Sequence, residues 1–564
     1  MRSQAARARA DGTPEAAKAT RADGVPEGAA AASDAASDGT GPPAAGLRRR
    51  WRGVTILTVV AALVYVTDAL IRFRRFLSST FDLVIFDQGI RGYAHFSAPV
   101  SIARGVADGG TAHFLLLSDH WSPLLAVLAP FYWIHDGPAT LLVAQGVLFA
   151  LAIPPLWAFT ARQLGPLAAY GVAAAYALSL PIMAAVTFDF HEVAFVPVLT
   201  AVMAERFQAG RRWPAIAAAV GLLLVKEDMG LLVAGYGAYL LLTRRRWTGL
   251  GFVAGCLAAT WLASHQLIPA FGGSATFYWA YGQFGPTLGS AAGNIVTHPL
   301  HALHVLVTPG VKVRTMIGLL APLAFLPLAS PLVLAAVPLL AERMLASGYP
   351  LWWQAKFQYN AFIVMIMFLA AVDGAARLQR WWQRAGWHLP PGRAGGNEHR
   401  RAGGNEHRRA RDWPPATIWA SLVLIAALLY VPFSPFGQLL HPKYYMVNSR
   451  MAAADRAVAQ VPSGVEVEAA NNVGPHLSGR DTVLLLDGTP RWAPWVVADT
   501  KGLDFPFCTP QQQAQDVAYL KAHGYRQVFA DDGYVVLHRP ADAKTRQALI
   551  HPPEAARIHI NVCY

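Results

Sequence analysis

The sequence contains little charge for its length. Lysine, arginine, aspartate and glutamate make up 14% of the 564 residues, whereas an average soluble domain contains about 25%. A soluble surface of this size would need more charge, so the scarcity argues against a chain of several soluble domains. Hydrophobic residues make up 54% of the chain, with 17 tryptophans and 26 phenylalanines. This balance predicts a multi-pass, α-helical membrane protein.

Cysteine is also scarce, since the chain contains only three. This count excludes a disulfide scaffold, and glycines without a fixed period exclude a collagen. Cys256 lies within an apolar run, whereas Cys508 and Cys563 both fall near the C-terminus. If that part faces an oxidising compartment, a disulfide between Cys508 and Cys563 would tie down the tail. The bridge and two free thiols both stay open.

The N-terminal segment lacks large apolar side chains. Residues 1–47 are mainly alanine, glycine, aspartate, proline and arginine, so they cannot bury enough surface to offset chain entropy. We expect a disordered cytoplasmic tail there. The cluster at 48–52 contains four arginines and precedes an apolar run at 54–71. A run of about 18 residues can span a bilayer, and a basic cluster before it predicts a cytoplasmic N-terminus.

Basic clusters recur between later apolar runs, and they account for the net charge of +13. The positive-inside rule explains them as cytoplasmic loops, so a nucleic-acid partner is not expected. The pattern predicts a transmembrane domain over 48–435, with external loops at 72–138 and 266–313 and a cytoplasmic loop at 376–414. About eleven spans are expected. They are 54–71, 139–160, 165–186, 192–207, 214–226, 229–243, 248–265, 314–329, 332–346, 357–375 and 415–433.

The C-terminal part changes character. Short β-rich runs at 465–470, 482–486, 495–498, 527–530 and 534–538 predict strands, and 511–523 predicts a helix that ends before a glycine. Residues 436–564 are therefore expected to form a small extracytoplasmic α/β domain, with a role in acceptor recognition or scaffolding.

Polar residues gather where the predicted topology places the external ends of the spans. Ionisable side chains at membrane depth are costly and are functional by default. The alternatives are a self-neutralised pair of Lys226 with Glu227, and helix capping by Asp119 or Ser122. A carboxylate can deprotonate a hydroxyl group, and a lysine can hold a phosphate. The candidate residues are Asp82, Asp87, Gln88, His120, Asp189, His191, Glu192, Lys226, Glu227 and Gln358.

Nucleotide-binding motifs are missing. The chain has neither a GxxxxGK[ST] loop nor a strand-linked GxGxxG. An enzyme that works outside the membrane would need another activated donor, and a lipid-linked one is the natural choice.

The segments FDLVIFDQG, DHWSPLLAVLAP, FDFHE, VKED and FQYNAFIVMIMFLAA, in that order, resemble the DUF2079 family of predicted bacterial multi-pass membrane proteins. The resemblance covers roughly residues 54–540. This family is similar to the C-type (GT-C) glycosyltransferase superfamily, whose members use polyprenyl-phosphate sugars. The resemblance implies that Asp82 or Asp87 is the catalytic acidic residue, in a loop that follows the first span.

The resemblance also implies partners. They are a polyprenyl-phosphate sugar in the bacterial plasma membrane and a glycan or protein acceptor of the cell envelope. On this hypothesis Lys226, His120 and His191 stabilise the departing phosphate, while Glu192 and Glu227 orient them. No cofactor is assigned, and a divalent metal is left open without named ligands. His298, His301 and His304 recur every third residue, and we favour a polar interfacial loop over a metal site there.

Two other functions stay open. A non-catalytic transporter or lipid flippase would use the polar cluster to line a passage, and a degenerate member would act as an envelope scaffold. A transporter is expected to show internal repeats and helices broken near the midplane. The sequence shows no matching halves, and its polar residues gather at the predicted outer ends, so the glycosyltransferase-like enzyme is favoured.

Overall fold

The computed structural model describes residues 43–107, 112–243, 245–385 and 414–540. Contacts divide the chain into two units, Met1–Arg49 and Arg50–Tyr564. Most of the predicted N-terminal tail, most of the predicted cytoplasmic loop and Cys563 lie outside the described residues. The Cys508–Cys563 disulfide therefore stays a prediction.

Five helical segments within the described residues are long and apolar enough to cross a membrane. Each runs for 19 to 27 residues, and about 20 are needed to span the hydrocarbon core. They are Trp51–Arg74 in α1 (Pro43–Arg74), Ala139–Leu164 in α6 (Ala139–Leu151) and α7 (Ile153–Leu164), Arg246–Ala270 beginning with α13 (Arg246–Leu262), Gln358–Arg384 with α19 (Ala361–Arg384), and Pro415–Phe433 with α20 (Pro414–Tyr430).

Two further apolar segments are bent pairs of helices. The first joins α8 (Pro166–Ala177) to α9 (Leu180–Val186) at 43°, and the second joins α16 (Pro299–Val307) to Gly310–Leu323 at 74°. A proline lies in the first turn of α9 and of α16, where its missing N–H costs least. Counting each pair as one span gives up to seven among the described residues, against the expected eleven.

The other expected spans correspond to shorter elements. Helices α11 (Arg212–Leu223) and α12 (Met229–Leu242) are apolar, but they contain only 12 and 14 residues. Helix α10 (Phe195–Gln208) has 14 residues, and the segment predicted at 332–346 forms a 3₁₀ turn followed by α18 (Val337–Leu345). The hydrophobic pattern located these elements, but their lengths fall short of a straight crossing.

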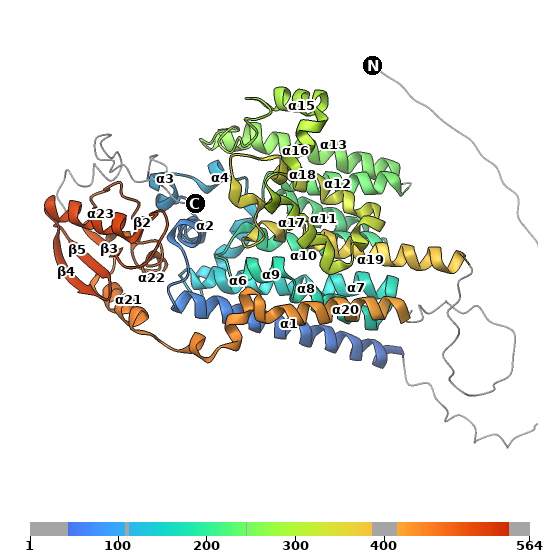
Figure 1. The fold of residues 1–564 in the computed structure, drawn as a ribbon, viewed down its shortest axis with the longest axis horizontal. Helices are drawn as coiled ribbons and strands as arrows, with labels where there is room; N and C mark the ends of the chain where they lie inside the picture. Colours follow the sequence, from blue (N-terminus) through green and yellow to red (C-terminus); the bar gives the residue numbers. More distant parts are fainter. Residues whose placement is uncertain (1–42, 108–111, 244, 386–413, 541–564) are drawn as a thin grey trace, which may run out of the picture. The chain divides into compact units, whose positions relative to one another are not determined.

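Helix α19 lies at the centre of the helical part. Its most apolar window is 89% buried, and it packs against α7, α10 and the 3₁₀ turn Leu326–Ala329 (Figure 1). Gly374 permits one of these contacts, because a Cβ there would lie 2.2 Å from the carbonyl oxygen of Leu326. A helix that is apolar on all sides is expected to be buried among other helices.

The C-terminal part contains one five-stranded sheet, in the order β2-β1-β3-β5-β4 (Figure 1). Strand β1 pairs in parallel with β2 and β3, whereas β5 pairs antiparallel with β3 and β4. The five predicted strands and the predicted helix are all present, with ends shifted by one residue at most. They are β1 (Glu466–Ala469), β2 (Thr482–Leu485), β3 (Trp495–Asp499), β4 (Arg526–Asp531), β5 (Tyr534–His538) and α23 (Pro510–Ala522).

The two faces of the sheet pack against different partners. Val496 and Leu537 lie in a core with residues of α23, whereas Val497 and Val536 lie in a core with α21 (Ser449–Gln460). This division follows from the two-residue period of a strand. The second core also contains Val84 from the loop that follows α1. The sheet and the first loop therefore share one hydrophobic core.

Candidate functional site

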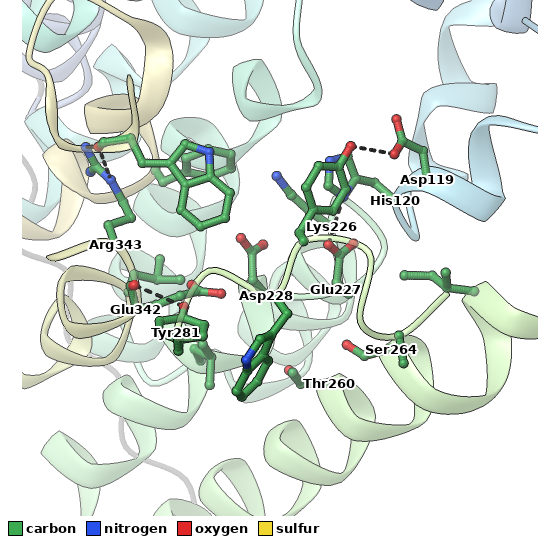
Figure 2. Close-up of a pocket in the computed structure, with 18 of the residues that line it drawn as sticks. Asp119, His120, Lys226, Glu227, Asp228, Thr260, Ser264, Tyr281, Glu342 and Arg343 are labelled. Atoms are coloured by element: carbon green, nitrogen blue, oxygen red, sulfur yellow. Dashed lines mark hydrogen bonds and ion pairs between the residues drawn. The ribbon is translucent and has the colours of Figure 1, made fainter. Parts of the chain in front are cut away.

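A cavity of about 210 Å³ lies among the helices and connecting loops. Aromatic rings supply much of its wall, and ionisable groups from three separate segments face it (Figure 2). The aromatic residues are Tyr278, Trp279, Tyr281, Trp352, Tyr359 and Phe362. The ionisable residues are Asp119, His120, Lys226, Glu227, Asp228, Glu342 and Arg343.

Lys226 comes from the five-residue connection between α11 and α12. Its Nζ lies 3.6 Å from Oε1 of Glu192, which begins the 3₁₀ turn Glu192–Ala194. The Lys226 side chain is 15% exposed and the Glu192 side chain 5%. Glu192 Oε2 and Asp228 Oδ1 are buried and have no hydrogen-bond partner among the described residues. A buried polar network with open acceptors suits a ligand that donates hydrogen bonds.

Arg343 brings a second buried cation to the cavity from α18. Its Nε and Nη2 donate to the carbonyl oxygen of Trp352 at 3.0 and 2.6 Å. Its Nη1 donates to the carbonyl oxygen of Tyr359 and to Oδ1 of Asn360. In the described part of the chain no carboxylate lies within ion-pair distance of this guanidinium. A buried cation held by neutral acceptors is a natural site for an anionic ligand.

His120 and Glu227 form an ion pair at the cavity wall. His120 Nδ1 lies 2.8 Å from Glu227 Oε1, and the Trp121 N–H donates to Glu227 Oε2 at 3.0 Å. Burial and the charge of Lys226 lower the pKa of His120, but the charge and hydrogen bond of Glu227 outweigh them, so the pKa is raised overall. Burial opposes ionisation of Glu227, yet the charge of His120 holds its pKa below the usual range. Each group thus favours the charged form of the other.

Asp119 does not cap a helix. Arg104 Nε and Nη2 lie 2.9 and 3.2 Å from its two carboxylate oxygens, and the Tyr278 hydroxyl donates to it at 2.5 Å. The Tyr278 ring in turn stacks on His120, with centroids 4.9 Å apart. Ser122 precedes the 3₁₀ turn Pro123–Leu128 but makes no side-chain cap. Asp119 therefore fixes the tyrosine that covers His120.

Asp82 belongs to a second group, which we call the Asp82 cluster: Ser79, Asp82, Asp189 and His191. Asp82 lies in a single π-helical turn, Thr80–Val84, and such turns occur frequently at functional sites. His191 Nε2 lies 3.4 Å from Asp82 Oδ1. The Ser79 hydroxyl lies 3.1 Å from Asp82 Oδ2 and 2.7 Å from Asp189 Oδ2.

The cluster has an uneven charge distribution. Burial, together with the nearby charge of Asp82, raises the pKa of Asp189 to about 6. Burial lowers the pKa of His191, but the hydrogen bond and charge of Asp82 outweigh it, so the pKa is raised overall. The Asp82 carboxylate thus favours the protonated form of His191. His191 directly precedes Glu192, which pairs with Lys226 on the cavity wall, so the cluster is linked to the cavity through the chain and this ion pair.

Asp87 and Gln88 lie apart from both groups, on α2 (Ile85–Ala94). The Asp87 side chain is 0% exposed, against 25% for Asp82. It accepts hydrogen bonds from Tyr132 and Ser478 and pairs with Arg91 at 2.9 Å. Gln88 donates to the carbonyl oxygen of Val483 in β2 and accepts from the first loop. Both residues hold the C-terminal sheet against the first loop.

The sequence prediction does not include several residues of the cavity, namely Glu342, Arg343 and the aromatic wall. Glu342 and Arg343 stand inside an apolar run, which is itself a signal of function. Gln358 was selected, and its buried Oε1 has no partner among the described residues. His298 and His301 belong to the start of α16, and no group of three metal-binding side chains occurs in the described ranges.

Comparison with protein families gives one match over most of the chain. A family model described as "Predicted membrane protein (DUF2079)" matches residues 72–536. No curated protein matches the sequence.

Among solved structures, ArnT from Cupriavidus metallidurans bound to undecaprenyl phosphate is similar, with a TM-score of 0.46 and 13% identity. The match covers 87% of this chain and 98% of that one. The Archaeoglobus fulgidus oligosaccharyltransferase, tethered to an acceptor peptide, has a TM-score of 0.43 and 10% identity, over 88% of this chain and 75% of the other.

Proposed function

The chain belongs to the DUF2079 family of predicted membrane proteins. We propose that it is a membrane glycosyltransferase that takes a sugar from a polyprenyl-phosphate donor. The acceptor would be a glycan or protein of the cell envelope. The observation that carries the proposal is a series of polar contacts beside the cavity. It runs from the Asp82 carboxylate to His191 and, through the adjoining Glu192, to Lys226, which lines the cavity together with the buried Arg343.

The cavity suits a phosphate and a sugar. Lys226, Arg343 and the protonated form of His120 supply positive charge among largely buried side chains, where each charge stabilises an anion strongly. Aromatic rings such as Trp352 offer apolar faces for a sugar ring, and Asp228 offers a free acceptor for its hydroxyl groups. Together these groups support a ligand with one anionic end and one polyhydroxylated end.

The reaction would follow from these positions. Asp82 removes the proton from the acceptor hydroxyl as its oxygen forms a bond to the anomeric carbon. The bond between that carbon and the phosphate oxygen breaks, and the polyprenyl phosphate leaves with the bonding electrons. Attack from the opposite face inverts the anomeric configuration. Lys226, Arg343 and His120 stabilise the charge on the leaving phosphate, while His191 orients Asp82.

The site would face the outside of the plasma membrane. The arginines at 48–52, which precede the apolar run of α1, support a cytoplasmic N-terminus, and the C-terminal α/β domain would then be extracytoplasmic. That placement agrees with a lipid-linked donor, since nucleotide sugars are not found outside the cell.

The proposal can be tested by release of the lipid carrier. The full chain in lipid nanodiscs is incubated with a panel of undecaprenyl-phosphate sugars and a cell-envelope extract, and free undecaprenyl phosphate is measured by mass spectrometry. The wild type is expected to release the carrier, and Asp82→Asn to reduce the rate by about 10² to 10⁴-fold, as for loss of a general base. Lys356→Met is the control, because this exposed cation does not line the cavity.

Two outcomes would contradict the proposal. Full activity of a well-expressed Asp82→Asn variant would remove Asp82 from the chemistry. Tight binding of every donor without release from any of them would favour the transporter or flippase.

A further inference from the structure

The turn that carries Asp82 is capped by a residue of the C-terminal domain. The Thr80 N–H donates to the carbonyl oxygen of Asn471 at 2.7 Å, and the Thr80 hydroxyl donates to the same oxygen at 2.9 Å. The Phe81 N–H donates to Asn471 Oδ1 at 2.9 Å. Asn471 itself is 8% exposed. It lies two residues after the parallel strand β1, and loops at the carboxyl ends of such strands often carry function.

These hydrogen bonds satisfy N–H groups that have no acceptor within the helical turn. The first N–H groups of a helix have no partner within the helix. Here the Ser79 hydroxyl accepts from the Asp82 N–H at 3.2 Å, and Asn471 accepts from the two N–H groups before it. The backbone around Asp82 is therefore fixed jointly by its own serine cap and by a residue nearly 400 positions further along the chain.

The packing leaves this turn little freedom. A Cβ at Gly474 would lie 2.1 Å from the Thr80 hydroxyl oxygen, so this position needs a glycine. The Phe81 ring packs against the Phe505 ring, with centroids 5.1 Å apart. The C-terminal domain thus contacts three parts of the turn: the backbone, the Thr80 hydroxyl group and the Phe81 ring.

We propose that Asn471 is a positioning residue for the transfer reaction, because it caps the Asp82 turn and thereby holds the carboxylate against His191. This inference rests on the proposed function. Misplacing a reacting group by about 1 Å can cost roughly 10²-fold in rate. Donor affinity should not change, because Lys226 and Arg343 come from other elements. The C-terminal domain would then be part of the catalytic apparatus rather than a scaffold alone.

Three variants of the full chain in nanodiscs test the role. Asn471→Ala removes the acceptor of the Phe81 N–H, whereas Asn471→Asp keeps an oxygen at that position. Asn472→Ala is the matched control, because its side chain donates to Asp499 and Tyr534 instead. For each variant, carrier release from the undecaprenyl-phosphate sugar that the wild type uses gives kcat. Binding of undecaprenyl phosphate alone gives the affinity for the carrier.

We expect Asn471→Ala to lower kcat by about 10 to 100-fold with unchanged affinity for undecaprenyl phosphate. Asn471→Asp should restore most of the rate, and Asn472→Ala should behave as the wild type. Equal rates in Asn471→Ala and the wild type would overturn the inference, as would a parallel loss of rate and carrier affinity. If the wild type is active and Asp82→Asn is inactive, the proposed function stands whatever the Asn471 variants show.

Amide hydrogen exchange tests the cap without any turnover. Asn471→Ala should raise the exchange rates of residues 80–82, and Asn471→Asp and Asn472→Ala should not. Unchanged exchange in Asn471→Ala would overturn the inference even if the chain turned over no donor.

Discussion

His191 Nε2 lies 3.4 Å from Oδ1 of Asp82, although the two residues come from different connections between helices. The other ring nitrogen, Nδ1, lies 3.1 Å from the carbonyl oxygen of Asp189. Because a carbonyl oxygen can only accept, Nδ1 must carry a proton for this bond to form. The ring is therefore oriented by two acceptors, and Asp82 has a histidine partner, whereas Asp87 pairs with Arg91.

Replacement by asparagine should affect stability at Asp87 and carrier release at Asp82. Asp87→Asn removes a buried charge from Arg91, Tyr132 and Ser478, so it should lower the free energy of unfolding by about 1–3 kcal/mol. Asp82→Asn should leave stability nearly unchanged and reduce the rate of carrier release by about 10² to 10⁴-fold. Thermal unfolding in detergent and the release assay measure the two effects. A fully stable but inactive Asp87→Asn variant would reverse the assignment.

Removing the buried cations should weaken binding of the carrier. Lys226→Met and Arg343→Met are each expected to raise the Kd for undecaprenyl phosphate by about 10 to 100-fold, since a hydrogen bond to a charged group contributes roughly 1.5–3 kcal/mol. Binding to the chain in nanodiscs can be followed by native mass spectrometry. Lys356→Met, which removes an exposed cation of a neighbouring segment, should bind as the wild type. Equal affinity in all four proteins would exclude the cavity as the phosphate site.

Carrier binding should weaken as the pH rises. Burial and Lys226 lower the pKa of His120, Glu227 raises it by more, and the net pKa lies above the ordinary value. His120 is therefore a cation below this raised pKa and loses its charge as the pH passes through it. Titration of undecaprenyl phosphate binding from about pH 6 to pH 9 should show the loss in the wild type, and His120→Gln should remove it. The carrier itself gains negative charge over this range, which acts in the opposite direction. Identical pH profiles for both proteins would contradict the role of His120.

The proposed orientation can be checked with single cysteines at exposed positions. Ser463→Cys lies in the C-terminal domain, and Gln383→Cys lies near the C-terminal end of α19. In spheroplasts, a membrane-impermeant maleimide should label the first without permeabilisation and the second only after it. The reverse pattern would place the site on the cytoplasmic side.

Helices and strands that a short stretch of residues specifies could be predicted from the sequence. The five C-terminal strands are short runs of β-forming residues, and the apolar run of α19 is long enough to be recognised by itself. Lys226 and Glu227 were found because charges interrupt an apolar region. The count of spans was less accurate, because α11 and α12 are apolar but too short to cross a membrane alone.

Other features depend on contacts between distant segments. Asp82 and Asp87 look alike in the sequence, and only packing against Ser478 and Tyr132 identifies Asp87 as a buried link. Nothing local connects Asn471 with Thr80 either, since they come together through the fold alone. Arg343 is different, because its place inside an apolar run was a signal that could have been used.

A structure of the full chain in nanodiscs with undecaprenyl phosphate tests the central claim most directly. We expect the phosphate in the cavity, within hydrogen-bonding distance of Lys226 or Arg343, with the Asp82 carboxylate facing the same space. A phosphate bound with full occupancy elsewhere, while this cavity stays closed to it, would contradict the account.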